Sequence, residues 1–156
     1  MKINITKEQY KELIDMLAIA NGIVSVLGDV MPETDYKKRS DKMDDIENHF
    51  LQFADDFGIV KLTQNNEYEG KITLDDEYYE NKILPIITDY EEFATQDTLS
   101  HELAWRDFRK EHSEKEMKEM KKENGGYFGV NLYAYEKKYW DEFEENGYDG
   151  LEIVKE

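Results

Sequence analysis

Cysteine is absent from the 156 residues, which excludes a disulfide framework, a thiolate nucleophile and a cysteine-ligated zinc site. Long apolar runs are absent too. The longest uncharged run, Met16 to Gly28, has 13 residues, whereas a membrane-spanning helix needs roughly 20. The opening residues MKINITKEQYKELID lack the apolar core of a signal peptide. We therefore expect a cytoplasmic protein that has no membrane partner and whose fold depends on side-chain packing.

Basic residues are scarce. The chain has 20 Lys and Arg against 37 Asp and Glu, a formal net charge of −17. The imbalance is greatest between residues 62 and 105, where eleven acidic and two basic residues lie. A field of this sign repels nucleic acid and anionic membranes and attracts basic proteins or cations. The alternative is that the acids only keep a housekeeping domain soluble.

The first half of the chain shows the patterns of helices. Thr6 and Gln9 form a capping box that opens a long apolar helix, and Pro32 ends it. A second helix is predicted from about Asp35 until Gly58 stops it. In the middle of the first helix, Gly22 indicates a close crossing with another helix.

The second half also has helical periodicity. One helix is predicted from Asp76 to about Ala94, with a kink or a new start at Pro85, because proline cannot donate a backbone hydrogen bond. A separate helix is predicted from Thr98 to His112 and another after the capping box of Ser113 and Glu116. The expected buried stripe of the 76–94 helix is Tyr79, Ile83, Ile86, Ile87, Tyr90 and Ala94.

Glycines and aromatics gather in the stretch NGGYFGVNLYAYEKKYW, residues 124–140. No strand precedes the glycines and no Gly-Lys-Ser/Thr follows them, so the context of a phosphate-binding loop is missing. We interpret the stretch as a joint: the glycines end one helix, 127–130 runs extended, and Asn131 caps a last helix that Gly147 ends.

Strand patterns are few and short. Lys2 to Ile5 and Leu151 to Ile153 alternate between polar and apolar residues and are expected to pair, and Lys71 to Leu74 is a further short strand. The predicted fold is mainly α: residues 1–156 form a single-domain helical bundle with a minor β-sheet made by the N- and C-terminal strands.

Motifs that carry chemistry are lacking. His101 and His112 lie about 16 Å apart along one helix, since each residue adds roughly 1.5 Å, so they cannot share a metal ion. No cofactor is predicted. One alternative stays open: a small metal-dependent enzyme in which His101 or His49 joins carboxylates from other helices.

The acidic middle of the chain is the leading candidate site. We expect a non-catalytic module whose acidic face binds a basic protein, as an antagonist that mimics nucleic acid or as an immunity-type inhibitor. The predicted partner-binding residues are Asp75, Asp76, Glu77, Glu80, Asp89, Glu91 and Glu92.

Four fragments carry a resemblance to other proteins: KINITKEQY (2–10), FADDFG (53–58), HELAWRDF (101–108) and EFEENG (142–147). They are similar to a group of small acidic bacterial proteins that has no known function. The resemblance implies a mainly helical stand-alone domain and carries over no functional residues.

Overall fold

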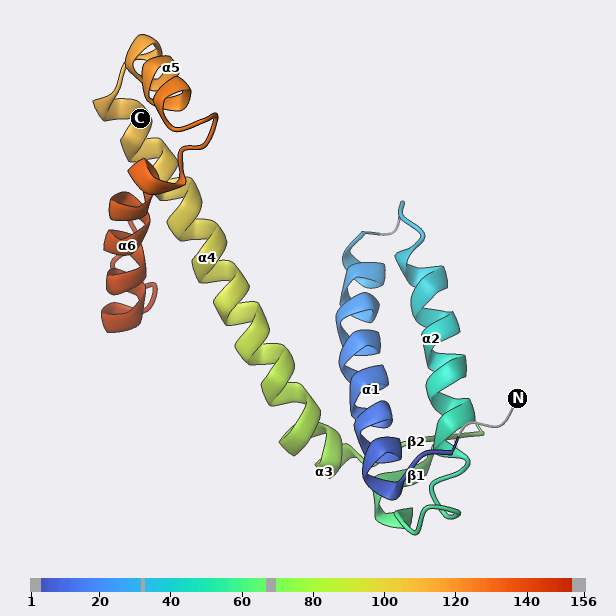
Figure 1. Ribbon diagram of the computed structural model, residues 1–156. Helices are drawn as coiled ribbons and strands as arrows, with labels where there is room; N and C mark the ends of the chain where they lie inside the picture. The colour runs from blue at the N-terminus through green and yellow to red at the C-terminus, as the bar shows by residue number, and fades with distance from the viewer. Residues whose placement is uncertain (1–3, 32, 67–69, 153–156) are drawn as a thin grey trace. The chain divides into compact units, whose positions relative to one another are not determined.

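The computed structural model describes residues 4–31, 33–66 and 70–152 (Figure 1). The fold is mainly α with one small antiparallel sheet in the described residues, as the sequence predicts. In chain order the elements are α1 (Lys7–Val30), α2 (Tyr36–Leu51), the 3-10 helix η1 (Val60–Leu62), β1 (Thr63–Asn66), β2 (Lys71–Leu74), α3 (Asp76–Tyr78), the π-helix η2 (Tyr79–Ile83), α4 (Leu84–Glu111), α5 (Glu114–Glu123) and α6 (Gly129–Asn146).

Two compact units make up the chain. Residues 1–90 form unit 1 and residues 91–156 form unit 2, and the helix α4 begins in unit 1 and continues into unit 2. That 1–156 behaves as a single domain stays a prediction, for which the Discussion gives a test.

Unit 1 is built on the antiparallel pair α1 and α2, which lie side by side (Figure 1). The capping box of Thr6 and Gln9 opens α1 as predicted. Near this end of α1, the Tyr10 hydroxyl donates to the Phe50 carbonyl at the end of α2, and the Tyr10 ring stacks on Phe57. The core of unit 1 consists of Tyr10, Ile14, Ala18, Leu51, Leu62, Leu74, Ile83 and Ile87.

The small sheet is the hairpin of β1 and β2, in which Thr63 pairs with Leu74. The predicted strand from Lys71 to Leu74 is therefore confirmed. The predicted terminal strands lie partly in 1–3 and 153–156, outside the described residues, and their described residues 4–5 and 151–152 belong to no strand. The described sheet is thus formed within unit 1 and not by the termini.

Pro85 is accommodated by a change of helix type. The Leu84 N–H donates to the Tyr79 carbonyl, five residues back, so a π-helix precedes the proline and α4 begins at Leu84. A π turn shifts the phase of the periodicity that follows it. The sequence predicts a kink or a new start at Pro85, and the structure has a change from π-helix to α-helix at Leu84 within one continuous helical segment.

The predicted break between the helices 76–94 and 98–112 is wrong, because α4 runs unbroken to Glu111. The polar residues at the expected break bond along the helix. The Thr95 hydroxyl donates to the Glu91 carbonyl, and the Gln96 amide donates to the Glu92 carboxylate. The second helix also ends earlier than predicted, at Leu51, and turns lead from there to Gly58.

Unit 2 consists of most of α4 together with α5 and α6. Its core is Ala104, Phe108 and Leu132, surrounded by partly buried aromatic and methionine side chains. The capping box of Ser113 and Glu116 opens α5 as predicted. Gly147, at φ 58°, ends α6, also as predicted.

The start of α6 differs from the prediction. The helix begins at Gly129, so Asn131 lies in its first turn instead of capping it, and 127–130 is not extended. The cap position belongs to Phe128, whose ring packs edge-on against Trp105 at 5.4 Å between centroids. Aromatic packing, rather than a polar cap, sets where this helix starts.

Both glycines of α1 lie where a β-carbon would be crowded, Gly28 by backbone and Gly22 by side chains. A β-carbon added to Gly28 would lie 2.9 Å from the Lys37 Cα, and one added to Gly22 would lie 2.7 Å from the Ile87 Cδ1. The obstacle at Gly28 is backbone of α2, which cannot move alone. The obstacle at Gly22 is the end of a side chain, which can rotate. A close helix crossing at Gly22 stays a prediction, because the atoms nearest to it belong to the side chains of Ile87 and Tyr79.

We expect Gly28→Ala to lower the free energy of unfolding by about 1–3 kcal/mol, the usual cost of overpacking. Urea denaturation measures this loss. Gly22→Ala is the matched control, and its loss should be smaller because Ile87 can move and alanine favours the helix by about 1 kcal/mol over glycine. Equal losses in the two variants would contradict the backbone argument.

Candidate protein-binding surface

The acidic residues predicted to bind a partner lie on one continuous helical segment made of α3, η2 and the first turns of α4. Two of them have local structural roles. The Asp75 carboxylate caps α3 by accepting from the Tyr78 N–H at 3.0 Å, and the Asp76 carboxylate accepts from the Gln64 side-chain amide at 2.6 Å. These two carboxylates are therefore already engaged in holding α3 and the hairpin.

The other five acids are exposed. Glu77, Glu80 and Asp89 belong to unit 1, and Glu91 and Glu92 belong to unit 2. Within the part of the chain that the structure describes, none of the seven predicted residues forms an ion pair. Their carboxylates do not contact one another, so the site is a surface without a convergent centre.

A phenol anchors this segment to α1. The Tyr78 hydroxyl donates to the Asp15 carboxylate at 2.8 Å, and the Lys11 ammonium lies 5.4 Å from the centre of the Tyr78 ring. Burial, reinforced by the bond to Asp15, raises the pKa of the Tyr78 phenol well above its usual range. The phenol stays protonated at neutral pH and keeps the bond that holds α3 on α1.

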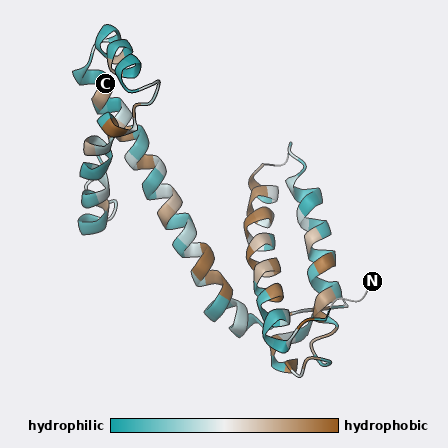
Figure 2. Cartoon of the chain, viewed as in Figure 1, coloured by the Kyte–Doolittle hydropathy of each residue, from teal (hydrophilic) through white to brown (hydrophobic). Residues whose placement is uncertain are grey.

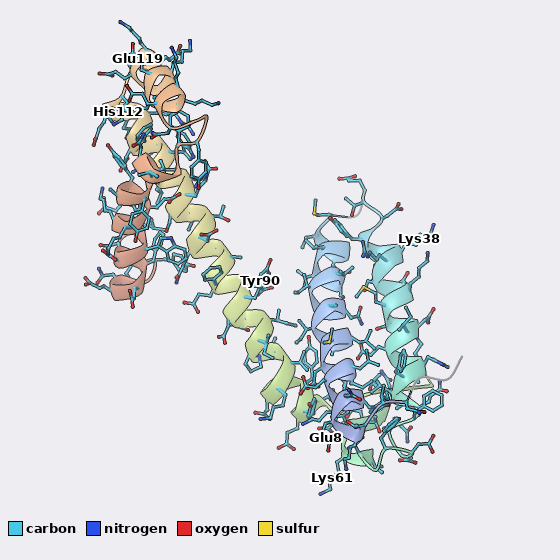
Figure 3. All side chains as sticks on the ribbon, viewed as in Figure 1. Glu8, Lys38, Lys61, Tyr90, His112 and Glu119 are labelled. Atoms are coloured by element: carbon cyan, nitrogen blue, oxygen red, sulfur yellow. The ribbon has the colours of Figure 1, made fainter. Side chains whose placement is uncertain are left out.

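Exposed apolar side chains lie beside the acids on α4. The sequence assigns Ile86 and Tyr90 to the buried stripe, but they are 50% and 57% exposed, whereas Ile83 and Ile87 are buried. Tyr90 extends from α4 (Figure 3). Which residues of this stripe are buried depends on the packing of unit 1, whose core contains Ile83 and Ile87. An exposed isoleucine and tyrosine one turn apart, next to Asp89, are typical of a protein-binding helix.

The histidines do not form a metal site in the described residues. No group of three or more His, Cys, Asp or Glu side chains is placed there to hold a metal ion. The His101 Nδ1 lies 2.8 Å from a Glu136 carboxylate oxygen, and the His101 Nε2 accepts from the Trp105 indole N–H at 3.0 Å. His49 packs edge-on against Phe50 and Phe53. His101 is thus held by hydrogen bonds, and His49 packs against aromatic rings.

A second polar network joins α4 and α6 in unit 2. The Tyr139 hydroxyl donates to the Asp107 carboxylate and accepts from the Arg106 guanidinium at 2.9 Å. The bond from Tyr139, together with Arg106, lowers the pKa of Asp107. The Asp107 carboxylate is therefore ionised at neutral pH, and its oxygens are occupied by structural contacts.

The helix α1 is apolar along much of its length (Figure 2). It is the one helix among the described residues that is long and apolar enough to cross a membrane by length and composition alone, a test that the core helix of a soluble protein also passes. Its Tyr10, Ile14 and Ala18 are buried in the core of unit 1. Cytoplasmic location and the lack of a membrane partner stay predictions.

Comparisons of the chain with protein-family models, with curated proteins and with solved structures find no match.

Proposed function

We propose that the protein is a non-catalytic binding protein whose acidic surface on α3, η2 and α4 engages a basic protein. The observation that supports this proposal is the set of exposed carboxylates that have no ion-pair partner among the described residues, in a chain with a net charge of −17. Ile86 and Tyr90 are exposed beside these carboxylates and offer apolar contact area to a partner.

The mechanism is occlusion of the partner's basic surface. Unpaired carboxylates attract a basic surface and speed the encounter, whereas the apolar side chains add contact area once the two surfaces meet. The basic surface belongs to a nucleic-acid-binding groove or to a toxin, so the protein acts as a nucleic-acid mimic or as an immunity-type inhibitor. In either case it binds no nucleic acid itself.

The alternative of a metal-dependent enzyme has less support. His101 contacts one carboxylate, Glu136, and its second ring nitrogen is occupied by the indole of Trp105. No observation on the described residues favours this alternative, and we do not propose a catalytic residue.

Reversing three exposed charges tests the binding proposal. We expect Glu77→Lys, Glu80→Lys and Asp89→Lys together to abolish capture of the partner, because each reversal replaces an attraction with a repulsion. The measurement is affinity capture from a lysate of the source organism at about 50 mM and about 500 mM salt, since salt screens exposed charges. The captured protein is then purified and titrated against wild type and variant.

The matched control reverses three exposed acids of α2 and the turns after it: Asp41→Lys, Asp45→Lys and Asp55→Lys. It changes the net charge by the same amount in the same unit, and circular dichroism verifies that both variants are folded. The proposal is supported if a basic protein is captured at low salt and the control variant still captures it. No salt-sensitive partner, or equal loss of binding in both variants, would overturn it.

A further inference from the structure

A hollow of about 270 Å³ lies in unit 2 between α4, α5 and the turn before α6. Its floor is apolar and its rim is mostly basic, which is unusual in a chain with nearly twice as many acids as bases. The residues that line it are Trp105, Arg109, Glu114, Met117, Lys118, Lys121 and Phe128.

The sequence builds this hollow from one helix face and one turn. Along α5 the lining positions 114, 117, 118 and 121 follow the spacing of a single helical face. After α5, Gly125 and Gly126 adopt φ of 63° and 95°, and the Gly126 N–H donates to the Lys121 carbonyl at 2.7 Å. This turn reverses the chain and brings Phe128 back beside α4 and α5.

The floor is made of two aromatic rings in contact. The rings of Trp105 and Phe128 meet edge to face at 5.4 Å between centroids, and Met117 packs against the same cluster. The basic groups lie over these rings. The Arg109 guanidinium carbon is 5.5 Å from the Trp105 ring, and the Lys121 ammonium is 5.9 Å from the Phe128 ring. A ligand body on the floor would therefore have its charged end within reach of both cations.

The basic groups of the rim are not neutralised by protein carboxylates. Among the described residues, Arg109, Lys118 and Lys121 form no ion pair. Glu114 is the one acid of the lining. At physiological salt the Debye length is about 8 Å, so the many distant carboxylates are largely screened and the groups of the rim decide which charge is bound.

We propose that this hollow is a binding site for a small organic anion with an apolar body, such as an aromatic or aliphatic carboxylate. The apolar body lies on Trp105, Met117 and Phe128, and the carboxylate faces the cations of the rim. The site belongs to unit 2 and does not depend on the acidic surface of the proposed function. It also gives the glycine pair a role beyond joining two helices, because their turn supplies Phe128 to the floor.

The test uses tryptophan fluorescence. The chain has two tryptophans, so in a Trp140→Phe background Trp105 alone reports on the site. The probe is 3-phenylpropionate, and 3-phenylpropionamide is its neutral counterpart with the same apolar body. We expect a saturable fluorescence change with the carboxylate. The affinity for the amide should be at least about tenfold lower, a difference of about 1.4 kcal/mol in binding free energy.

Three variants in the same background locate the anion. Lys118→Gln with Lys121→Gln should weaken binding of 3-phenylpropionate about tenfold or more, and Glu114→Gln should tighten it. The matched control, Lys115→Gln with Lys122→Gln, removes the same charge from residues of α5 outside the lining and should leave the affinity unchanged. Equal responses to carboxylate and amide, no saturable response, or equal losses in both lysine pairs would each overturn the proposal.

Discussion

Phe108→Ala is expected to lower the free energy of unfolding by about 3–5 kcal/mol, the usual cost of removing a fully buried aromatic ring. Phe108 is 1% exposed. Its ring contacts His112 at 4.5 Å, Tyr135 at 5.5 Å and Trp105 at 5.7 Å between centroids. These neighbours come from α4 and α6, so no single side chain can move to fill the space left by the ring.

The same variant tests whether 1–156 is a single domain. Trp105 and Trp140 both lie in unit 2, so fluorescence reports on that unit, whereas far-ultraviolet circular dichroism reports on helices of both units. Because one unbroken helix, α4, contributes Ile87 to the core of unit 1 and Phe108 to the core of unit 2, we expect the two units to unfold together. Urea curves from the two signals should then coincide in wild type and in Phe108→Ala.

Ile14→Ala is the matched lesion in unit 1. Ile14 is 0% exposed, and its truncation should cost about 2–5 kcal/mol. In a single domain, the fluorescence midpoint falls with this variant even though the lesion lies in the other unit. A fluorescence midpoint that stays unchanged while the dichroism curve divides into two steps would show two independently folding domains.

Signals that act within a few residues could be predicted from the sequence. The capping boxes of Thr6 and Ser113, the strand from Lys71 to Leu74 and the helix end at Gly147 all form as expected. The caps and the helix end depend on bonds within about five residues, and the strand needs only the neighbouring segment Thr63–Asn66, so no contact with a distant part of the chain decides these outcomes.

Features that depend on packing could not be predicted in this way. The exposure of Ile86 and Tyr90 depends on which side chains the core of unit 1 packs against, and that core takes Ile83 and Ile87 instead. The start of α6 depends on Phe128, whose ring packs against Trp105, more than twenty residues earlier in the chain. One feature of the sequence points to the basic hollow of unit 2: Met117, Lys118 and Lys121 share a helical face. No local pattern indicates that aromatic rings lie beneath them.

Asn21→Asp is expected to be the most damaging isosteric change in unit 1. The side-chain amide of Asn21, in the middle of α1, donates to the Asp44 carboxylate at 3.0 Å and to the Glu47 carboxylate at 3.2 Å, both on α2. The Asp44 carboxylate also has an ion pair with Lys71 at 3.6 Å. Asn21 thus supplies both N–H groups of one amide to two acids of α2 that otherwise repel each other.

The substitution replaces both donors with a third carboxylate. A hydrogen bond to a charged group contributes about 1.5–3 kcal/mol, so the loss of two bonds should cost about 3 kcal/mol or more at neutral pH. Asn21→Ala is the control, because it removes these two bonds without adding a charge, and it also removes the bond that Asn21 accepts from the Ser40 hydroxyl. Its loss should be smaller, and the difference between the two variants measures the repulsion among the carboxylates.

The pH dependence gives the sharpest test of this argument. Burial raises the pKa of Glu47 above its ordinary value of 4.5. The hydrogen bond from Asn21 lowers this pKa, and the charge of Asp44 raises it. A carboxyl whose pKa is raised in the folded state favours folding at low pH and loses that contribution as the pH rises through the folded pKa. A third carboxylate raises the pKa of Glu47 further. The deficit of Asn21→Asp should therefore be largest at neutral pH and should shrink as the pH falls toward 4.5. Thermal unfolding across this pH range measures the deficit in stability. A deficit that is constant with pH and equal to that of Asn21→Ala would mean that lost hydrogen bonds alone, and not charge, explain the effect.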